Sequence, residues 1–378
     1  MSSIAPSDPD LRAQMLLASY ARAGYAQIEL PVLQPAEPFL DLSGEDIRRR
    51  MFLTTDPDGR ELCLRPDLTI PVSLAYLHSP AAGQPAGYSY LGTVFRHSVG
   101  APAEFLQAGI ESFARTDKAA ADAEMLALGL EATAQYGLNS PDIRMGDVGL
   151  FAAFIGALDL APAWQRRLIK DFNRKWSLAH DLDQIALAGA GGAPEYQGVL
   201  AALGNADPKA AHHLVADLLS IAGIATVGGR SVDEIAERFL EHAALGGGTR
   251  LPRETRALIE RFLAVRGDPD EAAGELRALA AEASLALTPA LDQFETRTGF
   301  LAARGVDVRS IQFSTAFGRG FDYYTGFVFE VHDARVKAPL VAGGRYDGLL
   351  TRLGAREPIV AVGFAASIEE LKARGGAA

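Results

Sequence analysis

Residues 87–114 read GYSYLGTVFRHSVGAPAEFLQAGIESFA, and this stretch decides the fold. Its two halves, 87–97 and 104–114, are rich in aromatic and β-branched residues, and the short segment between them contains Gly100 and Pro102. This pattern is typical of two antiparallel strands joined by a turn. The stretch therefore predicts a β-hairpin and, with it, an antiparallel sheet.

The second half of the hairpin also carries a candidate ligand-binding face. Strand alternation puts one set of side chains on the same side of the sheet, namely Phe105, Gln107, Gly109, Glu111 and Phe113. The Cα atoms of Gln107 and Glu111 are expected to lie roughly 13 Å apart, a span that suits a ligand the size of an amino acid. Arg96, on the preceding strand, could meet a carboxylate there. An exposed face with solvated polar side chains accounts for the same pattern, and from the pattern alone it is the simpler interpretation.

The rest of the chain predicts an α+β protein with a helical insertion. A helix is expected from Leu11 to Gly24, with Ser7 as its cap and Pro9 in its first turn. Residues 159–285 are rich in alanine and leucine with interspersed charge, which favours a mostly helical module. Further strand-like segments occur at 25–30, 310–313, 327–332 and 359–362. The expected division is a core of 1–158 and 286–378, interrupted by an insertion of 159–285.

Composition limits the function classes. The 378 residues are 48% apolar, enough for a large core, and the formal charge of −11 opposes nonspecific attraction to RNA. A single cysteine, Cys63, excludes an internal disulfide and a thiolate zinc cluster. We expect no metal and no other cofactor. The sequence has neither a secretion signal nor an uninterrupted apolar run of membrane-spanning length, which predicts a cytoplasmic protein. Phosphate-loop, dinucleotide-binding and nucleophile-elbow motifs are absent.

Three more segments combine glycine with residues able to bind a ligand. LRPDLTIP, residues 64–71, offers a carboxylate and a hydroxyl two positions apart, but Asp and Thr also serve as helix caps. FGRGFDYYTG, residues 317–326, places an arginine between glycines and is followed by adjacent tyrosines. AGGRYDG, residues 342–348, has the composition of a glycine turn. Each segment alone is compatible with a purely structural role.

Taken together and in this order, the four segments resemble the histidyl-tRNA synthetase branch of the class II aminoacyl-tRNA synthetases over nearly the whole chain. Residues 24–31 resemble the first motif, which forms the dimer interface, and 95–111 resemble the second. Residues 319–326 and 343–347 resemble the two segments peculiar to histidine-specific members. The resemblance implies a class II synthetase-like antiparallel sheet flanked by helices, and a homodimer formed through the first-motif region.

The resemblance also implies a site for the amino-acid part of histidine. Asp67, Thr69 and Gln107 match positions that hold the ligand's α-amino group. Arg96 and Arg319 match positions near its carboxylate and the reacting phosphate.

A second set of matched positions surrounds the imidazole ring. Glu111, Tyr324 and Tyr346 belong to it, and a carboxylate with a phenol can pair both ring nitrogens. The full expected histidine-binding set is Asp67, Thr69, Arg96, Gln107, Glu111, Arg319, Tyr323, Tyr324 and Tyr346. No catalytic residue is expected among them.

Three departures from the synthetase pattern argue against a ligase. Glu370 occupies the third-motif position where synthetases carry an arginine that binds ATP phosphate, and a carboxylate repels phosphate. Ser98 follows Arg96 in a shortened loop where synthetases have an acidic residue. The chain also ends soon after the third motif, so we expect no anticodon-binding domain and no tRNA.

These departures resemble the regulatory subunits of ATP phosphoribosyltransferase, which are paralogues of histidyl-tRNA synthetase. The resemblance implies a non-catalytic subunit that binds L-histidine, assembles with a short-form catalytic subunit, and is required for activity and histidine feedback in the first step of histidine biosynthesis. Two alternatives stay open. One is a truncated synthetase paralogue that activates an amino acid for a non-tRNA acceptor, and the other is a stand-alone histidine sensor.

Overall fold

A computed structural model describes most of the chain, in two compact units. The described residues are 11–42, 47–98, 100, 102–160, 162–172, 178, 182, 217, 221, 252–319 and 323–375. The first unit comprises Met1–Ala153 with Phe262–Ala378, and the second is Phe154–Arg261. In the part of the chain so described, every helix is too short or too polar to cross a bilayer.

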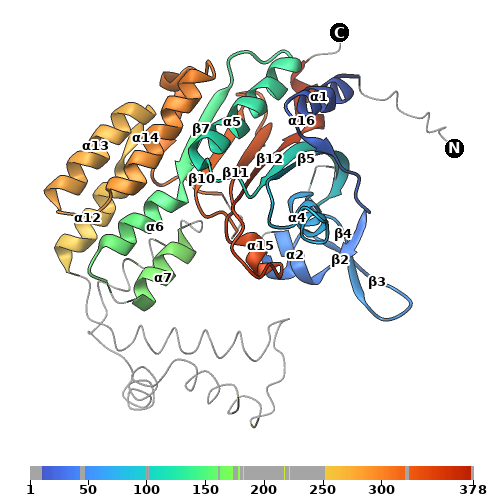
Figure 1. The fold of residues 1–378 in the computed structure, drawn as a ribbon, viewed down its shortest axis with the longest axis horizontal. Helices are drawn as coiled ribbons and strands as arrows, with labels where there is room; N and C mark the ends of the chain where they lie inside the picture. The colour runs from blue at the N-terminus through green and yellow to red at the C-terminus, as the bar shows by residue number, and fades with distance from the viewer. Residues whose placement is uncertain are drawn as a thin grey trace. The chain divides into compact units, whose positions relative to one another are not determined.

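A large sheet forms the centre of the first unit (Figure 1). Among the described residues it has nine strands, in the order β1-β5-β6-β12-β11-β10-β7-β9-β8. Only the β1–β5 and β7–β9 pairs are parallel. The strands are β1 (Ala26–Gln27), β5 (Ala86–Phe95), β6 (Glu104–Phe113), β7 (Asp142–Asp147), β8 (Arg266–Gly267), β9 (Ile311–Ser314), β10 (Phe327–His332), β11 (Val341–Arg345) and β12 (Ala361–Ser367). The predicted α+β class with an antiparallel sheet flanked by helices is confirmed.

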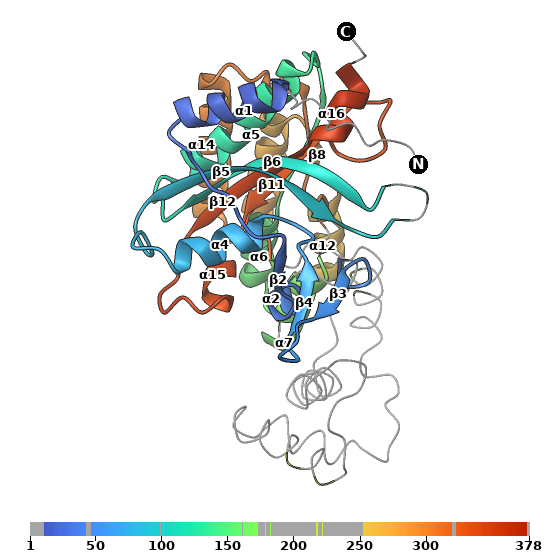
Figure 2. The same cartoon turned by 90° about the vertical axis from the view of Figure 1, so that its right-hand side faces the viewer.

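Helices cover both faces of this sheet (Figure 2). On one face lie α1 (Leu11–Arg22), α5 (Lys118–Gln135) and α14 (Thr288–Ala303), with α5 packed on β11 and β12. On the other lie α4 (Thr69–Leu77) and α15 (Leu349–Arg352), which contact each other. The Tyr76 ring of α4 stacks on Phe113 of β6 at a centroid distance of 4.3 Å. That stacking packs the C-terminal end of α4 against the end of β6.

The remaining elements of the first unit lie around this arrangement. A small antiparallel sheet has the order β2-β4-β3, with β2 at Leu33–Pro35, β3 at Phe52–Thr55 and β4 at Glu61–Leu64. Helix α2 (Glu37–Leu42) follows β2, a 3₁₀ turn (Val308–Ser310) precedes β9, and α16 (Ile368–Gly375) follows β12. Helix α13 (Pro269–Glu282) begins where Asp268 accepts bonds from the amides of Asp270 and Glu271, and it packs on α14.

The hairpin has the predicted form. Strand β5 pairs with β6 from Ala86↔Phe113 to Phe95↔Glu104, and β12 pairs along the other side of β6, with Gly363 opposite Glu111. The strand expected at 25–30 is shorter, since only Ala26 and Gln27 pair with β5. Beyond them the Ile28 amide still donates to the Ser89 carbonyl at 2.9 Å, and Pro31 has no N–H to donate. Ser7 and Pro9, the expected start of the first helix, lie outside the described residues.

The second unit corresponds only in part to the helical module expected at 159–285. Helix α7 (Pro162–Asp171) lies within it and buries Trp164 and Leu168, whereas α6 (Val148–Ala157) and α12 (Arg253–Ala264) each run across a boundary between the units. Helix α13 has the same composition as the module but belongs to the first unit, because its apolar side packs on α14 and β9. The amino-acid composition of a helix alone does not specify which unit it packs against. The glycine clusters at 189–192 and 246–248 lie outside the described residues.

Candidate functional site

One cavity of about 390 Å³ in the first unit brings together all nine residues expected to bind histidine. Its lining comes from the start of α4, from β6, β11 and β12, and from the segment before β10. The expected residues in the lining are Asp67, Thr69, Arg96, Gln107, Glu111, Arg319, Tyr323, Tyr324 and Tyr346. The hairpin face is therefore not a solvated surface, because Gln107 is 7% exposed and Glu111 is 1% exposed.

Glu111 accepts hydrogen bonds from three hydroxyl groups. Thr69 donates to it at 2.7 Å and Tyr90 at 3.3 Å, and Tyr346 donates to the other carboxylate oxygen. Burial raises the pKa of Glu111 to about 8, although the bond from Tyr346 lowers it. Near neutral pH the group therefore exchanges between a carboxylic acid, which donates, and a carboxylate, which accepts.

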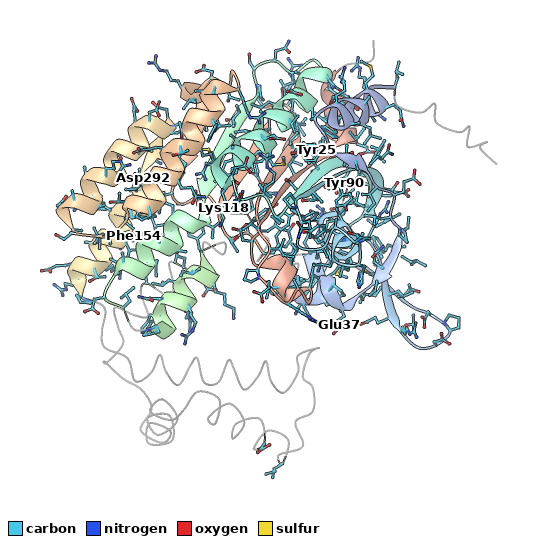
Figure 3. All side chains as sticks on the ribbon, viewed as in Figure 1. Tyr25, Glu37, Tyr90, Lys118, Phe154 and Asp292 are labelled. Carbon is cyan, nitrogen blue, oxygen red and sulfur yellow. The ribbon has the colours of Figure 1, made fainter. Side chains whose placement is uncertain are left out.

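Glycines make room for this carboxyl group. A Cβ atom on Gly363 would stand 1.8 Å from Glu111 Oε2 and 2.5 Å from the Ile110 carbonyl oxygen. A Cβ on Gly109 would stand 2.3 Å from the Tyr90 hydroxyl. Tyr90, which is labelled on β5 in Figure 3, reaches across Gly109 to both Glu111 and the Phe364 carbonyl. Sequence reasoning missed Tyr90, and its position opposite Gly109 was the available signal.

Asp67 lines the cavity, and only one of its two carboxylate oxygens has a hydrogen-bond partner among the described residues. Oδ1 accepts from the amide of Ile70, in the first turn of α4, at 3.1 Å, although the N-cap position itself is Leu68. Oδ2 is buried and has no hydrogen-bond partner among the described residues, and the same is true of Gln107 Oε1. Burial raises the pKa of Asp67, and the nearby Arg96 lowers it. Asp67 and Gln107 both line the cavity, and a ligand or water that donates N–H or O–H groups would satisfy these two acceptors.

Two arginines hold the loop that carries Asp67. Arg65 donates to the carbonyls of Thr93 at 2.7 Å and Leu30 at 2.5 Å, which joins the loop to β5 and to the first-motif segment. Arg96 donates from Nε to the Pro66 carbonyl at 2.6 Å and covers the Phe105 ring at 5.3 Å. Burial lowers the pKa of Arg96. The guanidinium of Arg96 is thus fixed by the loop while its side chain lines the cavity.

Arg319 is held by side chains of the segment that precedes β10 and of β10 itself. It donates to Glu330 at 3.1 Å and to the Tyr324 hydroxyl at 2.8 Å, and Glu330 also contacts His332 Nε2 at 2.9 Å. Burial lowers the pKa of Arg319, but Tyr324 and Glu330 outweigh it and raise the pKa. The cavity thus contains a fixed positive charge suited to a carboxylate.

Three tyrosines form an aromatic wall. The rings of Tyr323 and Tyr324 lie 4.8 Å apart, and Tyr323 meets Tyr346 edge to face at 5.9 Å. All three side chains are less than a tenth exposed. Such a wall packs against a flat ring, and the hydroxyl groups provide polar contacts at its edge.

The other end of the cavity differs from the synthetase pattern in charge. Glu369 and Glu370 both line it, and Glu369 accepts from the Leu106 amide at 2.7 Å. The Ser98 hydroxyl accepts a hydrogen bond from Arg50 at 2.7 Å. Arg50 is a basic residue of the cavity lining that sequence reasoning missed. Arg50 lies just before β3, and only the tertiary fold brings it to the hairpin turn.

Comparison with known proteins places the chain among relatives of histidyl-tRNA synthetase. The family model for histidyl-tRNA synthetase matches residues 9–227 and 212–371. A protein from Brucella canis, named ATP phosphoribosyltransferase regulatory subunit, is 42% identical over 358 residues, which cover 92% of this chain and 93% of that protein. A protein of the same name from Brucella abortus is also 42% identical over 92% of each chain.

Solved structures agree on the fold. A Bacillus halodurans protein described as an ATP phosphoribosyltransferase regulatory subunit/histidyl-tRNA synthetase has a TM-score of 0.67 at 22% identity, covering 100% of this chain and 82% of that one. Histidyl-tRNA synthetase from Nostoc has a TM-score of 0.61 at 19% identity, covering 99% and 75%.

Proposed function

Because the chain belongs to the family of ATP phosphoribosyltransferase regulatory subunits, which has the fold of histidyl-tRNA synthetase, we propose that it binds free L-histidine and regulates a separate catalytic subunit. The observation that carries the proposal is the cavity lined by all nine expected residues, with two unpartnered acceptors beside fixed arginines. The names of the relatives support the regulatory role.

The chemistry of the cavity supports a ligand that is a zwitterion and carries a polar ring. The α-ammonium group would donate to Asp67 Oδ2 and Gln107 Oε1, which have no partner among the described residues. The carboxylate would pair with Arg96 and Arg319. The imidazole would lie against the tyrosine wall with one ring nitrogen at Glu111. A ligand that leaves these buried groups unpaired is rejected, because each unpaired group costs about 1–3 kcal/mol.

Calorimetric titration tests this assignment through ligands that each lack one group. Histidine is expected to bind, and Glu111→Ala to abolish binding. Histamine lacks the carboxylate, imidazole lactate lacks the amino group, and phenylalanine lacks the ring nitrogens. Each analogue is expected to bind at least about tenfold more weakly than histidine. Equal affinity for histidine and phenylalanine would refute the role of Glu111.

Glu369 and Glu370 in the cavity lining support a subunit without ligase activity. ATP phosphate would meet Glu369 and Glu370 there, and like charges repel. The chain alone is expected to give no histidine-dependent exchange of pyrophosphate into ATP. Glu370→Arg, which exchanges repulsion for attraction, is expected to increase ATP affinity. Exchange activity in the wild-type chain would instead establish the truncated-synthetase alternative.

The regulatory part of the proposal requires a partner. Histidine changes the activity of a short-form catalytic subunit only if it binds one state of the complex more tightly, and such coupling is typically about 1–3 kcal/mol. We expect the catalytic subunit to be active only when this chain is added, and histidine to inhibit the mixture. Glu111→Ala is expected to keep activation and lose inhibition. Histidine binding without any effect on the catalytic subunit would identify a stand-alone sensor.

A further inference from the structure

A cluster of buried charges lies on the side of the sheet opposite the cavity, where α5 and α14 pack. Asp122 of α5 accepts from Arg345 at 2.8 Å and from Arg297 of α14 at 3.3 Å. Arg297 also contacts Asp147, at the end of β7, at 2.6 Å. The Asp122, Arg297 and Arg345 side chains are at most 4% exposed. Burying such ions is costly, and apolar residues often stabilise a core equally well, so stability alone does not explain the cluster.

The cluster extends directly to the cavity through the residues on either side of Tyr346. Arg345 donates to Asp347 at 2.9 Å, and Lys118 at the start of α5 donates to the other Asp347 oxygen at 2.8 Å. The Asp347 carboxylate also accepts from the Ala361 amide at 3.0 Å. Tyr346 lies just beyond the end of β11, so Arg345 and Asp347 fix its backbone from both sides.

A second connection leads to the other tyrosines. The Thr325 amide donates to the Arg345 carbonyl at 2.8 Å, and the Asp347 amide donates to the Thr325 hydroxyl at 2.9 Å. Thr325 follows Tyr324 directly in the chain. The arginine side chain also lies against Gly326, where an added Cβ would stand 3.1 Å from it. Two hydrogen bonds and one close contact therefore join residues 323–326 to residues 345–347.

We propose that Lys118, Arg345 and Asp347 are positioning residues for the cavity, which hold the Tyr346 hydroxyl against Glu111 and so determine how well the site takes its ligand. The ligand part of this inference rests on the proposed histidine site. The positioning part does not, because the Tyr346–Glu111 contact exists in the unliganded protein.

The first test needs no ligand. The pKa of Glu111 is followed by carbon NMR of its carboxyl group in the wild type, Asp347→Asn and Tyr346→Phe. Because the hydrogen bond from Tyr346 lowers this pKa, both variants are expected to raise it. The Asp347→Asn change in a Tyr346→Phe background is expected to add no further shift. An unchanged Glu111 pKa in Asp347→Asn would overturn the proposal.

The second test is a double-mutant cycle on histidine affinity. Asp347→Asn is expected to weaken binding about tenfold in the wild-type background and less than about twofold in the Tyr346→Phe background. Equal losses in both backgrounds would mean that Asp347 acts generally on the fold, which would also overturn the proposal. A wild-type chain that binds no histidine, together with the expected Glu111 shift, would refute the proposed function and leave the positioning inference standing.

A matched pair of surface variants guards against poor folding of Asp347→Asn. The Lys118 and Arg277 side chains are similarly exposed, at 41% and 39%. Lys118 pairs with Asp347 at 2.8 Å, and Arg277 pairs with Asp292 at 2.7 Å and with Glu295 at 2.5 Å. Figure 3 labels Lys118 on α5 and Asp292, a partner of Arg277, on α14. Lys118→Met is expected to raise the Glu111 pKa and weaken histidine binding, whereas Arg277→Met changes neither. Identical behaviour of the two variants would contradict the proposal.

Discussion

Tyr346 donates a hydrogen bond to Glu111 from a position 235 residues further along the chain. The contact joins the hairpin, formed early in the sequence, to a glycine-rich segment near its end. Together with the hydroxyls of Thr69 and Tyr90, it surrounds a single buried carboxyl group with three donors. Protonation of that carboxyl group should therefore affect the free energy of unfolding of the unliganded protein.

Glu111→Gln is expected to change how stability depends on pH. Burial raises the pKa of Glu111 from 4.5 to about 8, so the folded state keeps a proton that the unfolded state releases. This contribution to stability is fully present below pH 4.5 and is lost as pH rises through about 8, with a slope of at most about 1.4 kcal/mol per pH unit. The wild type should therefore lose stability relative to the glutamine variant between pH 5 and 8, in denaturant unfolding. Parallel curves for the two proteins would show that Glu111 ionises normally.

Gly363→Ala is expected to destabilise the protein and to abolish histidine binding. The added methyl group would overlap the Glu111 carboxylate and the Ile110 carbonyl, and such overpacking costs about 1–3 kcal/mol or more. Gly299→Ala is the matched control, since a Cβ there has no neighbour within 4 Å and the residue lies in α14. That change should instead stabilise by about 0.5–1 kcal/mol. Thermal unfolding of both variants distinguishes overpacking at Gly363 from the general effect of replacing glycine by alanine.

Asp67→Asn is expected to raise the stability of the unliganded protein and to weaken histidine binding. Burial of the carboxylate raises its pKa, and removing the charge relieves that cost, while the asparagine oxygen can still accept from Ile70. The ligand's ammonium group loses a charged acceptor worth about 1.5–3 kcal/mol, or roughly 10- to 150-fold in affinity. Unfolding and titration of the same sample measure both changes. A variant that binds histidine as tightly as the wild type would remove Asp67 from the site.

Arg297→Met is expected to destabilise the first unit severely. It leaves Asp122 and Asp147 buried without this cation, and breaking one side of a buried ion cluster costs about 3–5 kcal/mol. Denaturant unfolding gives the magnitude. Arg277→Met, which removes an exposed cation, is the control. A similar loss of unfolding free energy in both variants would show that the buried cluster contributes no more to stability than a surface ion pair.

Local sequence patterns predicted the elements that depend on alternation. The hairpin expected at 87–97 and 104–114 is observed at Ala86–Phe95 and Glu104–Phe113, and the strand at 327–332 has the expected bounds. The strand expected at 25–30 pairs over only two residues, because pairing ends where the chain leaves the sheet edge. The small sheet of β2, β3 and β4 was not predicted, since its short strands are mostly exposed and show little alternation.

The candidate site was predicted through motifs, and its supporting residues were not. Strand alternation indicated Arg96, Gln107 and Glu111. The resemblance to histidyl-tRNA synthetases completed the set of nine, including Arg319 and Tyr324, which no hydrophobic period would single out. Tyr90 and Arg50 were missed because their roles depend on strand register and on the loop before β3. The partnership of Asp122 with Arg345, separated by 223 positions, is likewise invisible until α5 packs on β11.

The placement of β12 between β6 and β11 has a consequence for biosynthesis. Gln107 pairs with Ser367 and Glu111 with Gly363, so one side of β6 stays without its neighbour until residues 361–367 have been synthesised. Contacts this distant in sequence form late and slow folding. A nascent or truncated chain that ends before residue 361 presents an open strand edge, which is a template for association with other chains.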